Sequence, residues 1–401
     1  MFERPRADLL IAGGLVLDVA TGERTRRDVG VRDGRVVEPS EVSGDAVVLD
    51  AGDATVLYGM WDCHNHPGSL MHDPTGESYF EPAPARAMRV IANLSDALRA
   101  GITGVRVLGE VDEIDMALAD ATSSGELIGP RVMPSGRTLH TTGGHGVVYP
   151  RDQMRSQYFD KVDGADAIRR SVRSHVEHGA KWIKVCLTGG LFSAHEAVDD
   201  AQFDDEEIQV LLATANSRSI PVAAHCGSPR IAEKFARLGG RSIEHGYFLD
   251  EAAAKVMAEN GVWLTPTISV SHDEEMMRAD GWPPHAIERA REVAERHREA
   301  VLTCLEAGVR ISIGVDLNPV TVRFHRELEL LESIGVPRLE VLRAATAGGR
   351  ELNGLGVGTA PAAGDPADVI VVEGDPMAGL DALKQVRHVV AHGRVATGGI
   401  G

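Results

Sequence analysis

The strongest constraint on the fold of this chain is a regular alternation of short apolar segments with amphipathic segments from residue 54 onward. The apolar segments have the length of buried strands, and they are centred near Val56, Val105, Val132, Ile183, Val222, Ile243, Trp263 and Ile311. The amphipathic segments have the spacing of helices, for example at residues 85–100, 165–178, 204–217 and 287–307. Eight strands that alternate with helices predict an α/β fold, a (β/α)8 TIM barrel.

Both ends of the chain are expected to form a smaller β unit. Residues 8–50 contain short apolar runs broken by Gly and Asp turn residues, which is typical of a small antiparallel sheet. Two strand-like runs, residues 367–375 and 386–395, follow the barrel region and most simply complete that sheet. A chain of 401 residues, 43% of them hydrophobic, can bury both cores. The predicted division is a β-sandwich of residues 1–55 and 351–401 beside a barrel of residues 56–350.

The overall composition argues against several classes of partner. A formal net charge of −18 disfavours nucleic acids and anionic membranes, because both attract basic surfaces. No apolar run approaches the roughly 18 residues needed to cross a bilayer, and the first residues lack the apolar stretch of a signal peptide. Four scattered cysteines predict free thiols in a reducing compartment. We therefore expect a soluble, cytoplasmic protein, and the sequence leaves its oligomeric state open, a homo-oligomer included.

Potential metal ligands stand at the ends of the apolar segments. His64 and His66 are two residues apart on one expected strand, so their side chains point to the same face and can share one ion. Neutral imidazoles are good ligands for zinc and similar ions. An isolated His-x-His pair is often structural, but here a whole series follows in order. The set is His64, His66, Lys184, His225, His245 and Asp316.

Lys184 is the least obvious member of this set. It lies inside the apolar run of residues 182–187, where a buried ammonium is costly unless it is paired or deprotonated. A lysine whose head group reaches solvent, or a simple ion pair, is the alternative explanation. Lys181 lies at the start of the same strand, far from the expected metal end. Cys186 is two residues after Lys184 and is expected to line the site.

Several motifs together resemble the metal-dependent amidohydrolase superfamily. Within it the chain looks most like the Xaa-Pro dipeptidases (prolidases) and the ochratoxinase-like enzymes, which are related to imidazolonepropionase. The resemblance covers essentially the whole chain, and its motifs are Asp62-Cys63-His64-Asn65-His66, Gly129-Pro130-Arg131, Thr142-Gly143-Gly144-His145-Gly146, Ile183-Lys184-Val185 with Thr188-Gly189-Gly190, His225, Glu244-His245-Gly246, Gly314-Val315-Asp316 and the tail of residues 358–368.

The resemblance implies a binuclear metal centre. The amine of Lys184 would react with carbon dioxide, and the resulting carbamate would bridge two divalent ions. Nitrogen and oxygen ligands suit zinc, which we expect first, and also manganese or cobalt. The implied ligands are His64, His66, carboxylated Lys184, His225, His245 and Asp316.

The implied reaction is hydrolysis of the C–N amide bond of a small substrate such as a dipeptide or an N-acyl amino acid. Two ions would acidify a bridging water, so that hydroxide forms near neutral pH and attacks the carbonyl carbon. Asp316 would orient this hydroxide and pass its proton to the leaving amine. His145, in the Gly-Gly-His-Gly loop, would stabilise the oxyanion. The weaker candidates for the substrate pocket are loop residues after the barrel strands: His140, Tyr247, His195, Asn318, Arg323 and His325.

Two other functions compete with this interpretation. A mononuclear deaminase or a cyclic amide or amidine hydrolase, like imidazolonepropionase, normally has an acidic residue near the strand-five histidine, whereas no glutamate follows His225 until Glu233. A barrel without catalytic activity would not be expected to retain all six ligands. The dipeptidases also carry a tyrosine shortly after this histidine, which residues 226–230 lack. Tyr247 could replace it in space, so dipeptide hydrolysis is only the default expectation.

Overall fold

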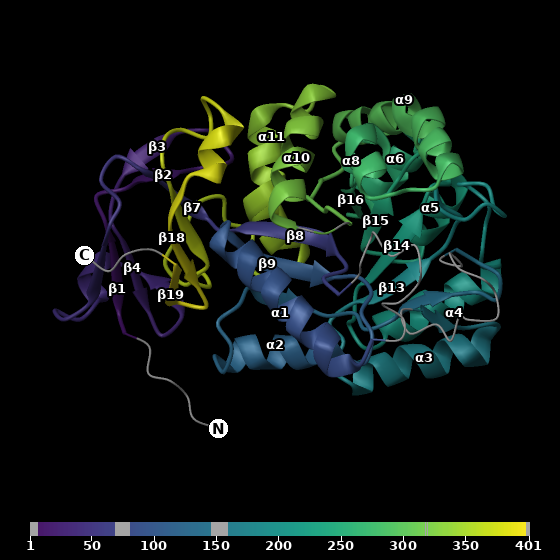
Figure 1. Ribbon diagram of the computed structural model, residues 1–401, viewed down its shortest axis with the longest axis horizontal. Coiled ribbons are helices and arrows are strands. Elements are labelled where there is room, and N and C mark those ends of the chain that lie inside the picture. The colour runs from purple at the N-terminus through teal and green to yellow at the C-terminus, as the bar shows by residue number, and fades with distance from the viewer. Residues whose placement is uncertain (1–6, 69–80, 146–158, 317, 319, 398–401) are drawn as a thin grey trace.

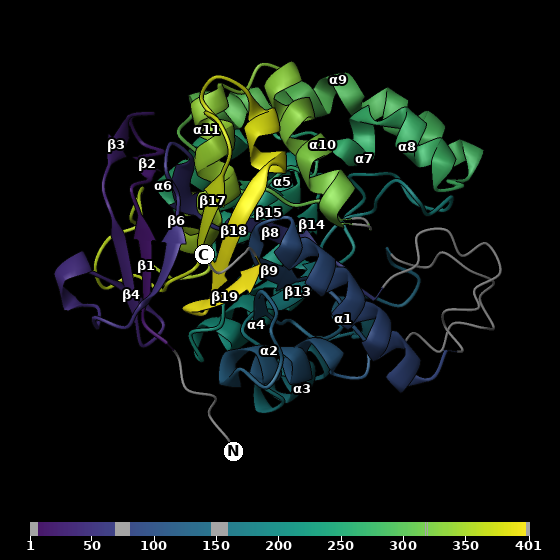
Figure 2. The ribbon, with the colours of Figure 1, turned by 60° about the vertical axis from the view of Figure 1, so that its left-hand side comes forward.

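The structure is a computed structural model that describes residues 7–68, 81–145, 159–316, 318 and 320–397. Figure 1 shows a β unit, built from both ends of the chain, beside a larger unit in which helices surround parallel strands. Figure 2 shows the helices α1, α2 and α3 on one side of these strands. No helix of the described residues is both long and apolar enough to cross a membrane.

The β unit is a sandwich of two sheets. One sheet has the order β5-β4-β1-β6, and its strands are β1 (Leu9–Ala12), β4 (Val29–Arg32), β5 (Arg35–Val37) and β6 (Val47–Asp50). The other has the order β19-β18-β17-β7-β2-β3, and its strands are β2 (Leu15–Leu17), β3 (Arg24–Arg26), β7 (Thr55–Tyr58), β17 (Val369–Val372), β18 (Val386–Ala391) and β19 (Arg394–Thr397). Buried side chains of both sheets, such as Ile11 and Val371, share one hydrophobic core. Both termini therefore build the sandwich, as predicted.

One strand assignment differs from the prediction. The strand expected near Val56 belongs to the sandwich, because β7 pairs with β17 and β2, and the predicted boundary between residues 55 and 56 falls inside it. Gly59 separates this strand from the first barrel strand. A Cβ atom there would lie 1.9 Å from Oγ1 of Thr103, so only glycine lets the two units approach this closely.

The strands of the larger unit are parallel and form two sheets, of order β10-β9-β8 and β12-β11-β13-β14-β15-β16. They are β8 (Met60–Asn65), β9 (Ile102–Val107), β10 (Arg131–Met133), β11 (Thr138–His140), β12 (Phe159–Lys161), β13 (Ile183–Cys186), β14 (Val222–Cys226), β15 (Ser242–His245) and β16 (Trp263–Thr265), and β12 pairs with β11 at the edge of the larger sheet. The last barrel segment, residues 310–316, makes an isolated bridge, Leu264 to Ile311. The Leu264 amide donates to the Arg310 carbonyl oxygen (3.0 Å) and the Cys63 amide donates to the Ile313 carbonyl oxygen (2.7 Å), so this segment joins β16 to β8 and brings the two sheets together around the barrel.

The helices cover the outside of this barrel. They are α1 (Ala83–Arg99), α2 (Ile114–Ser124), α3 (Ala165–Glu177), α4 (Asp205–Asn216), α5 (Pro229–Arg237), α6 (Glu251–Glu259), α7 (Ser269–His272), α8 (Glu274–Ala279), α9 (Pro284–Glu306), α10 (Val320–Ser333), α11 (Arg338–Arg343) and α12 (Gly349–Leu352). Helix α4 shows why they form. Asp204 and Glu207 make a reciprocal capping box, and Ile208, Leu211 and Ala215 bury one face at helical spacing.

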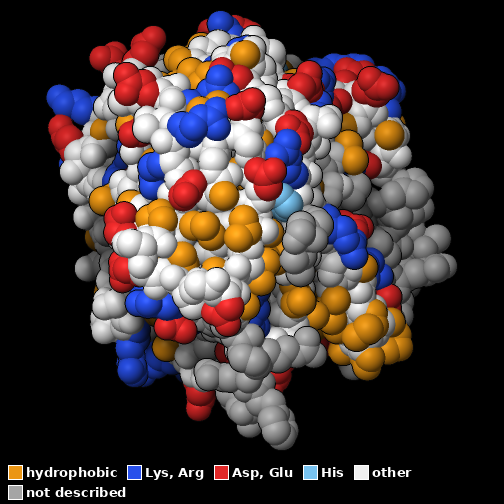
Figure 3. Space-filling view, turned by 90° about the vertical axis from the view of Figure 1, so that its left-hand side faces the viewer, with side chains coloured by type: hydrophobic (Ala, Val, Ile, Leu, Met, Phe, Trp, Pro, Cys, Tyr) orange, Lys and Arg blue, Asp and Glu red, His pale blue; other side chains and the backbone are white. Residues whose placement is uncertain are grey.

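The outer face of the sandwich carries mixed charge. Figure 3 shows acidic and basic side chains interspersed there, with hydrophobic side chains between them. Several of these charges form exposed pairs, such as Arg26 with Asp53 (2.5 Å) and Arg32 with Glu41 (3.6 Å). Such pairs contribute about 0–1 kcal/mol each, so this face is well solvated but adds little stability.

Candidate metal and catalytic site

Three predicted ligands meet at the carboxyl end of the barrel. His64 is near the end of β8, His66 directly follows this strand, and Asp316 follows the last barrel segment. The Nε2 atoms of His64 and His66 lie 3.3 and 3.2 Å from Oδ1 of Asp316. One potential ligand atom from each of the three residues lies within 4.8 Å of those of the other two. This separation suits three ligands of one ion.

The other predicted ligands border the same space. Nζ of Lys184, on β13, lies 3.3 Å from Nε2 of His64. The His245 ring centroid is 5.0 Å from that of His64 and 4.4 Å from that of His225. Lys181, at the start of this chain segment, is exposed. The structure therefore brings all six predicted ligands together, whereas Lys181 lies at the protein surface.

The hydrogen bonds of His66 and His225 fix which ring nitrogen is free. Nδ1 of His66 lies 3.1 Å from the Gly109 carbonyl oxygen, and Nε2 of His225 lies 2.8 Å from the Gly189 carbonyl oxygen. A carbonyl oxygen only accepts, so each of these nitrogens carries the proton. The opposite nitrogen of each ring then has a lone pair available for an ion.

His245 and His64 are oriented in the same way by side chains. The hydroxyl of Thr267 donates to the Pro266 carbonyl oxygen (2.7 Å), so its oxygen accepts from Nδ1 of His245 at 2.6 Å. Nδ1 of His64 lies 3.0 Å from Oε2 of Glu244. A carboxylate or hydroxyl behind each imidazole is the arrangement that holds metal-binding histidines in position. The four histidines thus fit a metal centre.

A buried ion pair lies beneath the ligands. Nη2 of Arg106, on β9, lies 2.9 and 3.0 Å from the two carboxylate oxygens of Glu244, and Nη1 lies 2.8 Å from Oγ of Ser242. Burial opposes ionisation of Glu244, but Arg106 and His64 lower its pKa to about 2. We did not predict this pair. Its signal in the sequence was one charged residue in each of two buried barrel strands, Arg106 in β9 and Glu244 in β15.

The backbone at the site is unusually strained. His245, Thr267 and Asp316 have φ angles of 67°, 48° and 60°, a region that side chains other than glycine rarely adopt. Each such residue costs on the order of 1–3 kcal/mol, and this kind of strain clusters at functional sites. Gly314 allows the last segment to approach β8, because a Cβ there would lie 2.5 Å from Cβ of His64. The strained residues carry or orient the ligands.

Burial and charge set the protonation of Lys184 and Asp316. Burial lowers the pKa of Lys184, and no carboxylate among the described residues lies within ion-pair distance of its Nζ. Burial alone would raise the pKa of Asp316, but His64, His66 and His245 hold it well below its usual range. The lysine is thus biased toward the neutral amine, and the aspartate toward the carboxylate. Burial also raises the pKa of the Cys186 thiol to about 12, so this residue lines the site as a neutral group.

His145 lies beside the ligands and has an unpredicted partner. Its ring stacks on that of His225 at a centroid distance of 4.2 Å. Its Nδ1 lies 2.6 Å from Oε1 of Glu196, which follows β13 in the sequence. A Cβ on Gly190 would lie 2.2 Å from the His145 ring, so this glycine makes room for it. The neighbouring residue His195, which we predicted instead, is exposed and has no described partner.

Tyr247 and His140 also border the site. The Tyr247 ring lies parallel to that of His245, with centroids 5.4 Å apart and an interplanar angle of 4°. Among the described residues, the Tyr247 hydroxyl has no hydrogen-bond partner. His140 holds the Gly-Gly-His-Gly loop, because its Nδ1 lies 3.2 Å from the His145 carbonyl oxygen. Gly146, the last residue of that motif, lies outside the described residues.

The other predicted pocket residues have different roles. Nδ2 of Asn318 donates to the carbonyl oxygen of His66 (2.6 Å), so Asn318 holds the backbone of a ligand. The Arg323 guanidinium pairs with Asp280 (2.6 Å). His325 lies on α10, and its charged neighbours Lys384, Glu329 and Asp381 are not among the predicted site residues. Its role in the pocket stays a prediction.

Comparison with known proteins places this geometry in a family. Residues 55–396 match the amidohydrolase family. The chain is 30% identical to the ochratoxinase of Aspergillus niger over 375 residues, which cover 86% of this chain and 76% of that protein. A solved prolidase, complexed with N-methylphosphonate-L-proline, has a TM-score of 0.87 and 29% identity, with 97% of this chain and 99% of that chain covered.

The crystal structure of the A. niger ochratoxinase agrees with this comparison. Its TM-score is 0.83 at 27% identity, and the match covers 99% of this chain and 98% of that chain. The predicted resemblance to prolidases and ochratoxinase is therefore confirmed, together with the TIM-barrel fold. The chain belongs to the amidohydrolase family and is a metal-dependent hydrolase that acts on carbon–nitrogen bonds.

Proposed function

We propose that this enzyme is a binuclear amidohydrolase that cleaves the amide bond of a dipeptide or an N-acyl amino acid. The observation that carries the proposal is the position of Lys184. Its Nζ lies 3.3 Å from Nε2 of His64 and points into the space shared by the predicted ligands. A cationic ammonium would repel metal ions at this place. A carbamate on the same nitrogen would supply the anionic bridge that two ions need.

The surroundings of Lys184 support this modification. Only the neutral amine reacts with carbon dioxide, and burial lowers the pKa of Lys184 toward that form. The reaction joins Nζ to the carbon atom and releases one proton. His64 and His66 with Asp316 would hold one ion, and His225 with His245 would hold the other. Histidine nitrogens with carboxylate oxygens suit zinc first, and manganese or cobalt as alternatives.

The residues of the chain have distinct roles in the proposed hydrolysis. Two divalent ions at this site would acidify a shared water and polarise the substrate carbonyl. Asp316, held as a carboxylate, accepts a proton from the attacking water and delivers it to the leaving nitrogen. His145, oriented by Glu196, donates a hydrogen bond to the carbonyl oxygen as negative charge develops there. The C–N bond breaks, the acyl carbon gains the water oxygen, and the amine leaves protonated.

The substrate class rests on the relatives and on the chemistry of the pocket. One relative is an ochratoxinase, and one solved relative is a prolidase that binds N-methylphosphonate-L-proline. We propose a small-molecule amide rather than a nucleic acid or a membrane lipid, in keeping with the net charge of −18. The four cysteines are free and buried, which suits the proposed cytoplasmic location. A homo-oligomer remains compatible with the proposal.

Metal content per chain tests the proposal. Wild-type protein prepared with bicarbonate should contain two equivalents of metal and hydrolyse a panel of Xaa-Pro dipeptides and N-acyl amino acids. Lys184→Ala should contain one equivalent or none and lose activity, whereas Lys181→Ala is the matched control and should behave as wild type. One equivalent in both the wild type and Lys184→Ala would exclude the bridge and favour the mononuclear deaminase or ring hydrolase.

A further inference from the structure

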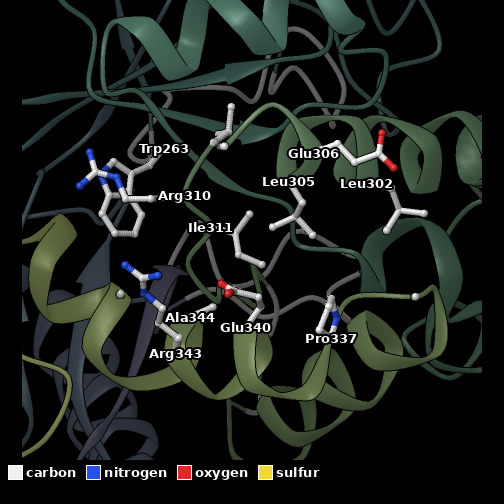
Figure 4. Close-up of a pocket in the computed structure, with 14 residues that line it drawn as sticks. Trp263, Leu302, Leu305, Glu306, Arg310, Ile311, Pro337, Glu340, Arg343 and Ala344 are labelled. Atoms are coloured by element: carbon white, nitrogen blue, oxygen red, sulfur yellow. The ribbon is translucent and has the colours of Figure 1, made fainter. Parts of the chain in front are cut away.

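A second cavity lies at the opposite end of the barrel from the metal ligands. It has a volume of about 600 Å³, within the range of small-molecule sites. Its walls are formed by Trp263 at the start of β16, by Arg310 and Ile311 at the start of the last barrel segment, and by residues of helices α9 and α11. In Figure 4, Glu340 and Arg343 project from α11 toward Trp263, Arg310 and Ile311 on the facing wall.

Glu340 and Arg343 are oppositely charged but unpaired. Both are partly buried, and among the described residues neither side chain forms a hydrogen bond or an ion pair. They are three positions apart on one helix, a spacing at which such charges normally attract. In the described α-helices, several acid–arginine pairs with the same order and spacing do form ion pairs, for example Asp96 with Arg99, Asp166 with Arg169, and Glu295 with Arg298.

The other charged residues that line the cavity are Arg310, which is already paired, and Glu306, which is exposed to solvent. Arg310 pairs with Glu351, and its guanidinium lies over the Trp263 ring at 4.6 Å from the centroid. Leu302, Leu305 and Pro337 supply an apolar wall opposite these groups. The cavity therefore presents one acidic and one basic side chain, Glu340 and Arg343, beside an apolar surface. A ligand that covers these charges removes them from water, which is favourable only when it also pairs and hydrogen-bonds with them.

We propose that this cavity binds an α-amino acid with an apolar side chain. The ligand carboxylate pairs with Arg343, its ammonium pairs with Glu340, and its side chain packs on Leu302 and Leu305. A zwitterion pairs with Arg343 and Glu340 at once without adding net charge to the cavity. The inference goes beyond the proposed hydrolysis and does not depend on it, because none of these residues belongs to the metal site.

The cavity is also connected to the metal site through two barrel segments. β16 starts at Trp263 in the cavity wall and leads to Thr267, which orients His245. The last segment starts at Arg310 and ends at Asp316. A ligand that makes the starts of these two segments more rigid can therefore affect Thr267 and Asp316, which lie at their other ends.

Calorimetric titration with L-leucine tests the binding site. Wild type should bind leucine, and Arg343→Gln and Glu340→Gln should each bind it at least tenfold more weakly, since each loses one charged contact. Two leucine analogues separate the charges. 4-Methylpentanoate, which lacks the ammonium, and 3-methylbutylamine, which lacks the carboxylate, should each bind wild type at least tenfold more weakly. Arg99→Gln, which removes an exposed arginine from an i, i+3 pair, is the matched control and should keep the wild-type affinity.

Three outcomes would overturn the proposal. Wild type could fail to bind leucine at millimolar concentrations, or both cavity variants could bind it as tightly as wild type. Binding could also disappear in Lys184→Ala while it persists in Arg343→Gln, which would place leucine in the metal site. Unchanged circular dichroism and metal content in Arg343→Gln and Glu340→Gln establish that loss of binding is not loss of folding.

Discussion

Oε2 of Glu244 lies 3.0 Å from Nδ1 of His64, and the same carboxylate is bound by Arg106. All three side chains are almost completely buried. The proposed ligand His64 is therefore supported by the Glu244 carboxylate, whose charge is balanced by Arg106. A carboxylate behind a metal-bound imidazole fixes the ring orientation and raises its basicity.

Glu244→Gln should weaken metal binding by roughly tenfold to a hundredfold, because the amide cannot support His64 as a carboxylate does. The free energy of unfolding should also fall by about 3–5 kcal/mol, because Arg106 is left buried without its counter-charge. Metal titration and denaturant unfolding measure the two effects. Glu295→Gln, in an exposed helical pair, should change neither by a measurable amount. Wild-type metal affinity in Glu244→Gln would show that His64 does not need this support.

Stability should depend on pH through His297. Burial lowers the pKa of this histidine to about 3, and its Nε2 lies 2.9 Å from the His245 carbonyl oxygen. The unfolded chain binds the proton more readily, with a pKa near 6.5. The stabilisation is thus fully present above pH 6.5 and decreases as the pH falls toward 3, by up to about 4–5 kcal/mol.

His297→Gln should therefore flatten the dependence of the unfolding free energy on pH between 6.5 and 3. Urea unfolding of metal-free protein at a series of pH values measures this dependence. His178→Gln is the matched control, because the His178 side chain is about half exposed and its ion-pair partner among the described residues is the exposed Glu113. An unchanged slope in His297→Gln would mean that another group produces the acid sensitivity.

Glu196→Gln should lower kcat by roughly tenfold to a hundredfold with a smaller change in KM. The carboxylate fixes the orientation of His145, and its effect on the developing oxyanion is felt mainly in the transition state. Glu196→Ala should lower kcat further, because glutamine still accepts a hydrogen bond from the ring. Steady-state kinetics on the best amide substrate measures both. Equal losses in kcat for the two variants would indicate a structural role for the loop alone.

Tyr247→Phe should lower kcat/KM by roughly tenfold and leave metal content and stability unchanged. The ring packs on His245 in either form, whereas the hydroxyl has no protein partner among the described residues and is free to bind substrate. A hydrogen bond to a charged substrate group contributes about 1.5–3 kcal/mol. Kinetics and elemental analysis together check the prediction. Wild-type kcat/KM in Tyr247→Phe would show that only the ring is used.

Local sequence patterns predicted the ligands and the helices because the relevant physics is short-range. His64 and His66 share a face through the two-residue repeat of a strand, and the barrel places its strand ends together. The acidic run that starts at Asp204 caps α4 through contacts within four residues. These features depend on neighbours along the chain, so they are visible before folding.

Pairings between distant segments could not be predicted in this way. β7 is buried along its whole length, as a barrel strand would be, and only its pairing with β17 and β2 assigns it to the sandwich. Likewise, the sequence offers both His195 and Glu196 after β13 as candidate site residues. Only the course of the loop decides that Glu196 is the one that contacts His145.

The sequence by itself thus determined the barrel, the terminal β unit and the identity of the six proposed ligands. Only the tertiary structure decided which groups stand behind those ligands, namely Arg106 and Glu244 beneath His64, Thr267 behind His245, and Glu196 behind His145. Each of these contacts joins barrel segments or loops that are separated in the chain. Their distances follow from how the whole barrel packs and closes, which no local pattern encodes.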